Sequence, residues 1–298
     1  MFLVVHYPYD KNFDMGETTM QVNFMTVLLG LASAIVWGGG DFCGGQATRR
    51  SSVFSVLLVA EFSGLLLLIA LALAWGEALP STRTLLWSAL AGWLGVMGLM
   101  ALYQGLAIGK AGVVAPTSAV LAAAIPVLYG ALTQGLPDAP HLAGFGLALL
   151  AVWLVAQADD GGGPVKGLGL ALLAGCGFGG FFIVIHQAST TTTFWPLAIA
   201  RAIAVPFVFA MIRYRHITSS LPRPALLLAL LCGALDAGGN IFFLLAAQTG
   251  RLDVAAVLSS LYPASTVLLA WLILGERTSW VQRIGVVTAL GAIALIAS

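Results

Sequence analysis

Charged residues are scarce in this sequence. Only 8% of its 298 residues are charged and 60% are hydrophobic, whereas soluble domains carry about 25% charged residues. The polar side chains are too few to cover a surface that faces water on all sides, so the sequence predicts an integral membrane protein. The 13 basic and 12 acidic side chains nearly cancel, to a net charge of +1, which leaves no basic surface for nucleic acid.

Cysteine and several enzyme motifs are rare or absent as well. Cys43, Cys176 and Cys232 lie in separate apolar runs without CxxC spacing, which argues against a disulfide framework and against a metal site. There is no GxxxxGK[ST] phosphate loop, so ATP is not the direct source of energy. There is no HExxH or GxSxG motif either. We therefore expect no catalytic residues, no metal and no cofactor, and a protein that is not an enzyme.

The sequence does contain ten apolar runs, each about the 20 residues that a membrane-spanning helix needs. The runs are continuous and do not alternate with polar residues, which favours helices over the strands of a barrel. The predicted fold class is an all-α integral membrane protein with ten transmembrane helices. The runs lie near residues 25–47, 53–75, 84–107, 112–134, 141–157, 167–188, 194–212, 224–248, 253–274 and 280–297.

The runs fall into two halves of five. Matches recur at an offset of 141 residues, as between Ser118 and Ser259, and LGLASAIVWGGGDF of the first span aligns with LGLALLAGCGFGGF of the sixth. An odd number of spans per half would insert the second half upside down, and inverted repeats are typical of secondary transporters. We predict a polar leader without a cleaved signal, expected to be disordered, then two repeats joined by a Gly-rich linker: 1–24, 25–157, 158–166 (linker) and 167–298.

Three stretches resemble the EamA-type transporters of the drug/metabolite transporter superfamily. They are IVWGGGDF in the first span, ALYQGLAIGKAGVVAP from Ala101 to Pro116, and VLSSLYPASTVLLAWLILGERTSWVQRIG from Val257 to Gly285. The first half departs from the family pattern at TQGLPD, Thr133–Asp138, where a GE pair is usual. The resemblance implies ten helices with both termini on one side, a cavity among helices one, three, four, six, eight and nine, and export or exchange of small metabolites.

Four ionisable residues lie well inside the predicted spans: Asp41, Glu61, Arg201 and Asp236. Each would cost about 2.5–3.5 kcal/mol near the bilayer centre if it faced lipid, so all four must face protein or water. Glu61 and Arg201 occupy corresponding positions, 140 residues apart, and are predicted to form an intramembrane ion pair. That pair would be either a fixed bridge between the halves or a gate that breaks during transport.

With Arg201 assigned to Glu61, Asp41 and Asp236 have no intramembrane cation. Such carboxylates take up a proton or bind a positive group, which suits proton coupling or amine binding; the alternative is a carboxyl that only bonds neighbouring backbone. Trp37 and Asn240 each lie one helical turn from one of these acids. We therefore predict a substrate-binding or coupling role for Trp37, Asp41, Asp236 and Asn240.

Prolines in the fourth and ninth spans, Pro126 and Pro263, are predicted to kink their helices and free backbone carbonyls. Ser259 and Tyr262 lie beside the second kink and Tyr103 and Gln104 lie near the end of the third span, so all four are candidates for a cavity or its vestibule. The alternative for these residues is helix packing alone.

The sequence thus favours a secondary active transporter of small organic metabolites, such as amino acids or amines, in the bacterial inner (plasma) membrane. Its partners would be the substrate, the lipid bilayer and protons, with no nucleic acid; the oligomeric state stays open. A channel or a structural membrane partner is the alternative, and a membrane-embedded enzyme is a weaker one. Basic residues of the loops favour termini outside the cytoplasm, whereas the family resemblance favours termini inside, and the orientation stays open.

Overall fold

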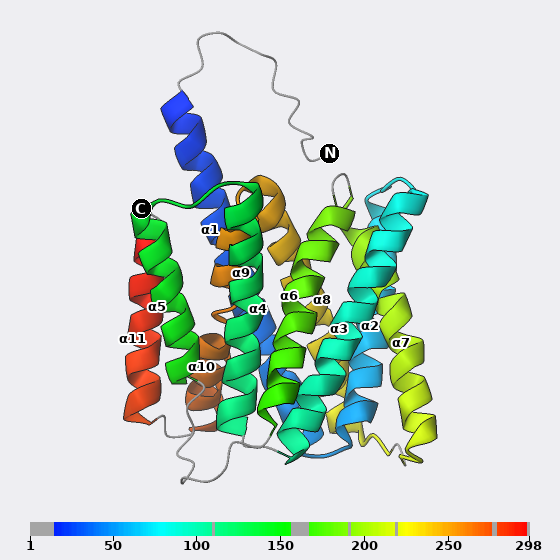
Figure 1. Cartoon of the computed structure of the whole chain (residues 1–298). Helices are drawn as coiled ribbons and strands as arrows, with labels where there is room; N and C mark the ends of the chain where they lie inside the picture. Colours follow the sequence, from blue (N-terminus) through cyan, green and yellow to red (C-terminus); the bar gives the residue numbers. More distant parts are fainter. Residues whose placement is uncertain are drawn as a thin grey trace.

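The computed structural model describes residues 15–108, 111–155, 167–189, 192–217, 220–275 and 279–296. Within these ranges the chain forms eleven α-helices and no strand (Figure 1). The first half contains α1 (Met15–Thr48), α2 (Val53–Ala74), α3 (Thr82–Ile108), α4 (Ala111–Thr133) and α5 (Ala139–Val155). The second contains α6 (Leu168–Ala188), α7 (Phe194–Tyr214), α8 (Arg223–Thr249), α9 (Leu252–Ser259), α10 (Tyr262–Leu274) and α11 (Trp280–Ile296).

Ten apolar helical segments account for these helices, because α9 and α10 together form one segment. Seven are long and apolar enough to cross a membrane, including Phe24–Thr48 and Leu252–Leu274. Three shorter apolar helices correspond to the fourth, fifth and last predicted spans: Thr117–Thr133, Ala139–Leu154 and Arg283–Ile296. The chain is an all-helical integral membrane protein, as the composition predicts.

The predicted boundaries differ from the helices at the start of the chain. Residues 15–24, which the sequence places in a disordered leader, belong to α1, because the polar residues ahead of the first apolar run extend the same helix. Residues 1–14 of the leader and the linker 158–166 lie outside the described residues.

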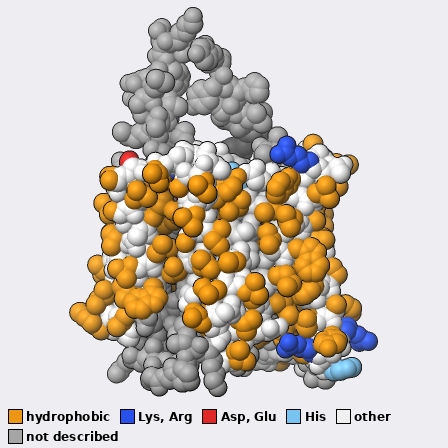
Figure 2. All heavy atoms as spheres, in the orientation of Figure 1, with side chains coloured by type: hydrophobic (Ala, Val, Ile, Leu, Met, Phe, Trp, Pro, Cys, Tyr) orange, Lys and Arg blue, Asp and Glu red, His pale blue; other side chains and the backbone are white. Residues whose placement is uncertain are grey.

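The lateral surface of the bundle is apolar. Figure 2 shows hydrophobic side chains over the height of the bundle and Lys or Arg side chains at its two ends. Many large apolar residues point outward, among them Leu132 at 87% exposure and Leu227 at 67%. Exposed apolar surface of this extent is unfavourable in water and favourable in lipid, so it marks the face that contacts the bilayer.

The first helices of the two halves run in opposite directions. In Figure 1, α1 runs downward through the bundle, whereas α6 runs upward. The most extensive helix contacts are α1 with α8 and α3 with α6, and α5 packs against α11 and α2 against α7. The two halves are therefore interleaved, and the cavity described next lies between them.

Candidate functional site

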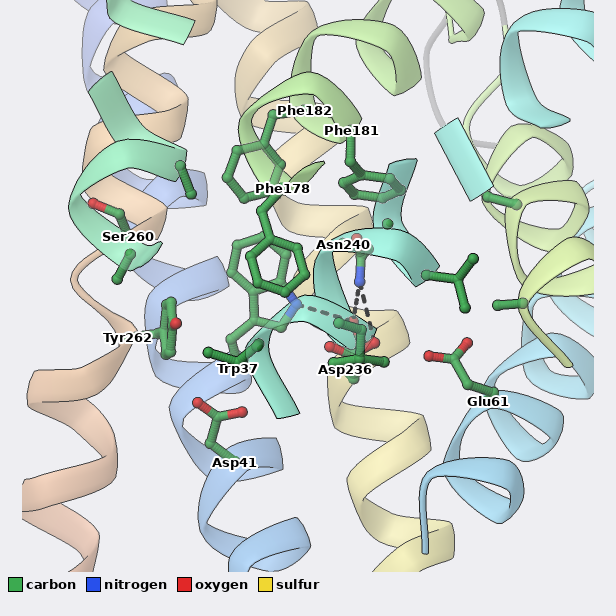
Figure 3. Close-up of a pocket in the computed structure, with 18 of the residues that line it drawn as sticks. Trp37, Asp41, Glu61, Phe178, Phe181, Phe182, Asp236, Asn240, Ser260 and Tyr262 are labelled. Atoms are coloured by element: carbon green, nitrogen blue, oxygen red, sulfur yellow. Dashed lines mark hydrogen bonds between the residues drawn. The ribbon is translucent and has the colours of Figure 1, made fainter. Parts of the chain in front are cut away.

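A cavity of about 530 Å³ lies among the helices. Its lining comes from α1, α3, α4, α6, α8 and α10, which are the six spans that the family resemblance assigns to a cavity, and also from α2 and α7. Those two helices contribute Glu61 and Arg201. Of the predicted site residues the cavity brings together Trp37, Asp41, Glu61, Arg201, Asp236, Asn240, Tyr262 and Pro263. Figure 3 labels six of them: Trp37, Asp41, Glu61, Asp236, Asn240 and Tyr262.

Arg201 joins three helices through two carboxylates. Its Nη1 donates to Glu61 Oε2 at 2.9 Å, and its Nη2 pairs with Asp236 Oδ2. Arg201 is buried, with 7% of its surface exposed, while the Glu61 and Asp236 side chains are 16% and 42% exposed. The structure thus pairs Glu61 with Arg201, but the expectation that Asp236 has no cation is wrong. The halves interleave, and α8 carries Asp236 to the other side of the same guanidinium.

Small residues make room for this triad. A Cβ atom on Gly64, three residues after Glu61 on α2, would lie 2.9 Å from Arg201 Cζ. A Cβ atom on Gly233 of α8 would lie 2.2 Å from the main-chain oxygen of Ala60. Because α2 and α8 approach this closely, the guanidinium fits between them and both carboxylates reach it.

Asp236 is also held by its neighbours. Asn240 Nδ2 donates to the Asp236 main-chain oxygen at 2.8 Å and to its Oδ2 at 3.3 Å. Trp37 Nε1 donates to the Asp236 main-chain oxygen at 3.3 Å. These contacts connect α1 to α8 at the level of the cavity.

Asp41 is in a different environment. It is exposed although it lies seven residues before the end of the membrane span Phe24–Thr48, and it lines the cavity. Figure 3 shows its carboxylate below Trp37 and Tyr262, on the opposite side of the view from Glu61. Asp41 makes no hydrogen bond and no ion pair with any residue that the structure describes. It is therefore a carboxylate that is free to meet a ligand or a proton.

Aromatic rings form one wall of the cavity. Trp37 stacks on Phe182, with ring centroids 5.7 Å apart, and meets Tyr262 edge-on at 6.3 Å. Phe178 and Phe181 of α6 also line the space. The three phenylalanines were not among the site residues predicted from the sequence. GFGGFF of α6 does align with the Trp37 segment of α1, and this repeat match was the signal that could have found them.

The ninth span is broken where the sequence predicts a kink. α9 ends at Ser259 and α10 begins at Tyr262, with Pro263 in its first turn. The hydroxyl next to the break that lines the cavity belongs to Ser260. Ser259, the predicted residue, is fully buried and faces α1, where its Oγ lies 3.5 Å from the Gly30 main-chain oxygen.

Other predicted positions lie away from the cavity. Pro126 is buried within α4, which continues as one helix to Thr133, and Gln104 is exposed; neither lines the cavity. The side chain of Tyr103 lies outside the described residues.

A further acid, absent from the predicted site residues, lies at one end of the bundle. Glu77, in the turn after α2, accepts hydrogen bonds from the backbone amides of Thr193, Phe194 and Trp195 at 2.7–3.1 Å. A carboxylate at this place satisfies the free amides at the start of α7 and is stabilised by its helix dipole.

A buried layer lies between the cavity and the Glu77 end of the bundle. On α8 it begins one turn after Asn240, with Phe243 and Leu244 both fully buried, and on α6 it includes Ile185. At the same end Tyr129 Oη accepts a hydrogen bond from Gln187 Nε2 at 2.8 Å, which connects α4 to α6. Buried side chains and this hydrogen bond thus lie between the cavity and this end of the bundle.

Comparisons with known proteins agree with this architecture. The family model of the EamA-like transporter family matches residues 165–298. Among the solved structures that match, a protein crystal structure aligns with a TM-score of 0.75 and 17% identity, over 91% of this chain and 97% of its own. At that identity the likeness establishes the fold. No curated protein matched the chain.

Proposed function

Since this chain is a membrane transporter of the EamA, drug/metabolite transporter type, we propose that it carries small organic metabolites by alternating access through the central cavity. One observation carries the proposal. The cavity of about 530 Å³ contains three carboxylates and a guanidinium, and it lies among helices whose outer faces are apolar. Ionisable groups at such a depth are expensive and mark a transport path.

The packing of the helices supports an inverted repeat as the basis of the transport cycle. If α1 to α5 correspond in order to α6, α7, α8, the α9–α10 pair and α11, the contact of α1 with α8 corresponds to that of α6 with α3. The contact of α2 with α7 joins two corresponding helices, and so does the contact of α5 with α11. Each of these contacts is therefore unchanged when the halves are exchanged. In such an architecture the halves exchange conformations, so the cavity opens to the two sides in turn.

We assign the energy source to a gradient of protons or of substrate. The sequence has no phosphate-binding loop for ATP. Asp41, with no partner among the described residues, is the group that takes up a proton or a substrate. The Glu61–Arg201 pair joins α2 to α7, a contact made between the halves, and can hold them in the conformation seen here. Export or exchange across the bacterial plasma membrane is the role that this arrangement suits.

Reconstituted protein tests the proposal. Proteoliposomes containing the whole chain should show uptake of a labelled amine or amino acid that saturates with concentration and is accelerated by unlabelled substrate on the opposite side. A pH gradient should raise the plateau for the native protein but not for Asp41→Asn. Because Asp41 has no partner to lose among the described residues, this variant should fold normally.

The matched control is Asp138→Asn. Asp138 is an exposed carboxylate that accepts a hydrogen bond from the His141 amide at the start of α5 and does not line the cavity. This variant should behave as the native protein does. Flux that rises linearly with concentration, or single-channel currents, would contradict the transporter proposal and indicate a channel.

A further inference from the structure

We propose that the cavity selects organic cations, namely amines with an apolar or aromatic body, over solutes that carry a carboxylate, and that Asp41 is the counter-charge. The inference rests on the proposed function, because it names the substrate class of the same cavity. It separates the amines from the amino acids, which the sequence left together.

The first step is the charge of the lining. Among the described residues that line the cavity, three are acids, Asp41, Glu61 and Asp236, and one is a base, Arg201. The sum is −2 when every group is ionised and −1 after the uptake of one proton. The cavity is thus negative in either state, and a site of one sign enclosed by apolar walls concentrates ligands of the opposite sign.

The second step is that Arg201 is already engaged. Its two terminal nitrogens are each bonded to a carboxylate, Glu61 on one side and Asp236 on the other. Two carboxylates thus already outweigh the single positive charge of this guanidinium. A substrate carboxylate would either add a third negative charge beside it or displace one of the acids and leave that acid uncompensated in the membrane interior. An amino acid therefore gains an ionic contact for its ammonium group and meets repulsion at its carboxylate, whereas an amine gains the contact alone.

The third step is the shape of the space around Asp41. Trp37 precedes Asp41 by four residues, which is one turn and about 6 Å along the same helix. The ring of Tyr262 packs edge-on against the ring of Trp37. Phe178 and Phe181 extend the aromatic wall. A cation next to Asp41 can thus place its apolar body on these rings, which also attract cations through their π-systems.

The experiment uses four probes with the same phenyl body and different charge. They are phenethylamine (cation), N-acetylphenethylamine (neutral), phenylalanine (zwitterion) and 3-phenylpropionate (anion). Equilibrium binding of each labelled probe is measured to the whole chain in lipid nanodiscs near neutral pH, without a gradient. Phenethylamine should bind at least tenfold more tightly than phenylalanine, and phenylpropionate should bind weakest.

The Asp41→Asn variant should lose the advantage of phenethylamine over its neutral N-acetyl analogue, and Asp138→Asn, the exposed control, should keep it. Equal or tighter binding of phenylalanine or phenylpropionate overturns the inference, as does a cation preference that survives Asp41→Asn. The absence of saturable phenethylamine binding at millimolar concentration also overturns it.

Binding and flux separate this inference from the proposed function. Selective phenethylamine binding without saturable uptake in proteoliposomes would refute the proposed transport function but support the proposed cation site. Saturable uptake of phenylalanine without any preference for phenethylamine would support the transport function and refute the cation site.

Discussion

Removal of the Arg201 guanidinium tests the triad most directly, because two acids depend on it. We expect Arg201→Gln to fold with markedly lower stability. Arg201 and Glu61 are both largely buried and their nitrogen and oxygen atoms lie 2.9 Å apart. Breaking a buried ion pair from one side costs about 3–5 kcal/mol, because the remaining charge stays buried without a partner. The contact with Asp236 adds less, since that side chain is 42% exposed and solvent screens it.

Thermal unfolding in detergent, followed by the loss of helical circular dichroism, measures the change. At about 2–4 °C per kcal/mol, the melting temperature should fall by roughly 6 °C or more. A variant that melts with the native protein would show that the pair contributes no stability, and the reasoning from burial would fail.

The charge swap then separates the two acids. Glu61→Arg combined with Arg201→Glu restores an ion pair across α2 and α7, but it places the new carboxylate at position 201 against Asp236. We therefore expect the swap alone to recover less than half of the lost stability. Adding Asp236→Asn should recover most of the remainder. Full recovery by the swap alone would mean that Asp236 does not contact Arg201.

Two further predictions concern helix packing and capping. A Cβ atom on Gly239 of α8 would lie 2.3 Å from the Trp37 ring, so Gly239→Ala should displace the indole, cost about 1–3 kcal/mol and slow transport. Gly45→Ala on α1 is the control: no atom of the described residues lies within 4 Å of its added Cβ, so it should be neutral or stabilising by up to about 1 kcal/mol. Glu77→Ala should cost about 0.5–2 kcal/mol and speed amide hydrogen exchange at residues 193–195. Unchanged exchange there would show that the carboxylate does not cap α7.

Most of the fold could be predicted from the sequence, because the bilayer strongly restricts the structures that a chain can form within it. Continuous apolar runs of about 20 residues can form only helices in lipid, so hydropathy alone is enough to place the spans. The ion pair of Glu61 with Arg201 could be predicted from their opposite charges and their corresponding positions in the two halves. These two signals are local or periodic, and a single sequence displays both.

The remaining features depend on how helices pack, which one sequence does not encode in a readable pattern. Asp236 reaches Arg201 because Gly233 lets α8 approach α2 closely, and a lone glycine in an apolar run gives no hint of its partner. Glu77 lies in a turn and caps a helix more than a hundred residues away. The choice of Ser260 over Ser259 as the cavity hydroxyl depends on rotation at the helix break, which spacing does not fix.

The break in the ninth span divides it into two parts with different freedom. All eight residues of α9 are buried, whereas none of α10 is. α10 rests on α1 at Gly38, where a Cβ atom would lie 2.4 Å from Ser265 Cβ, and Gly38 is three residues from Asp41. A tilt of α10 as a rigid rod about the break would thus press on the backbone that carries Asp41. If Asp41 holds a cation as we propose, we expect binding of that cation to change the tilt of α10.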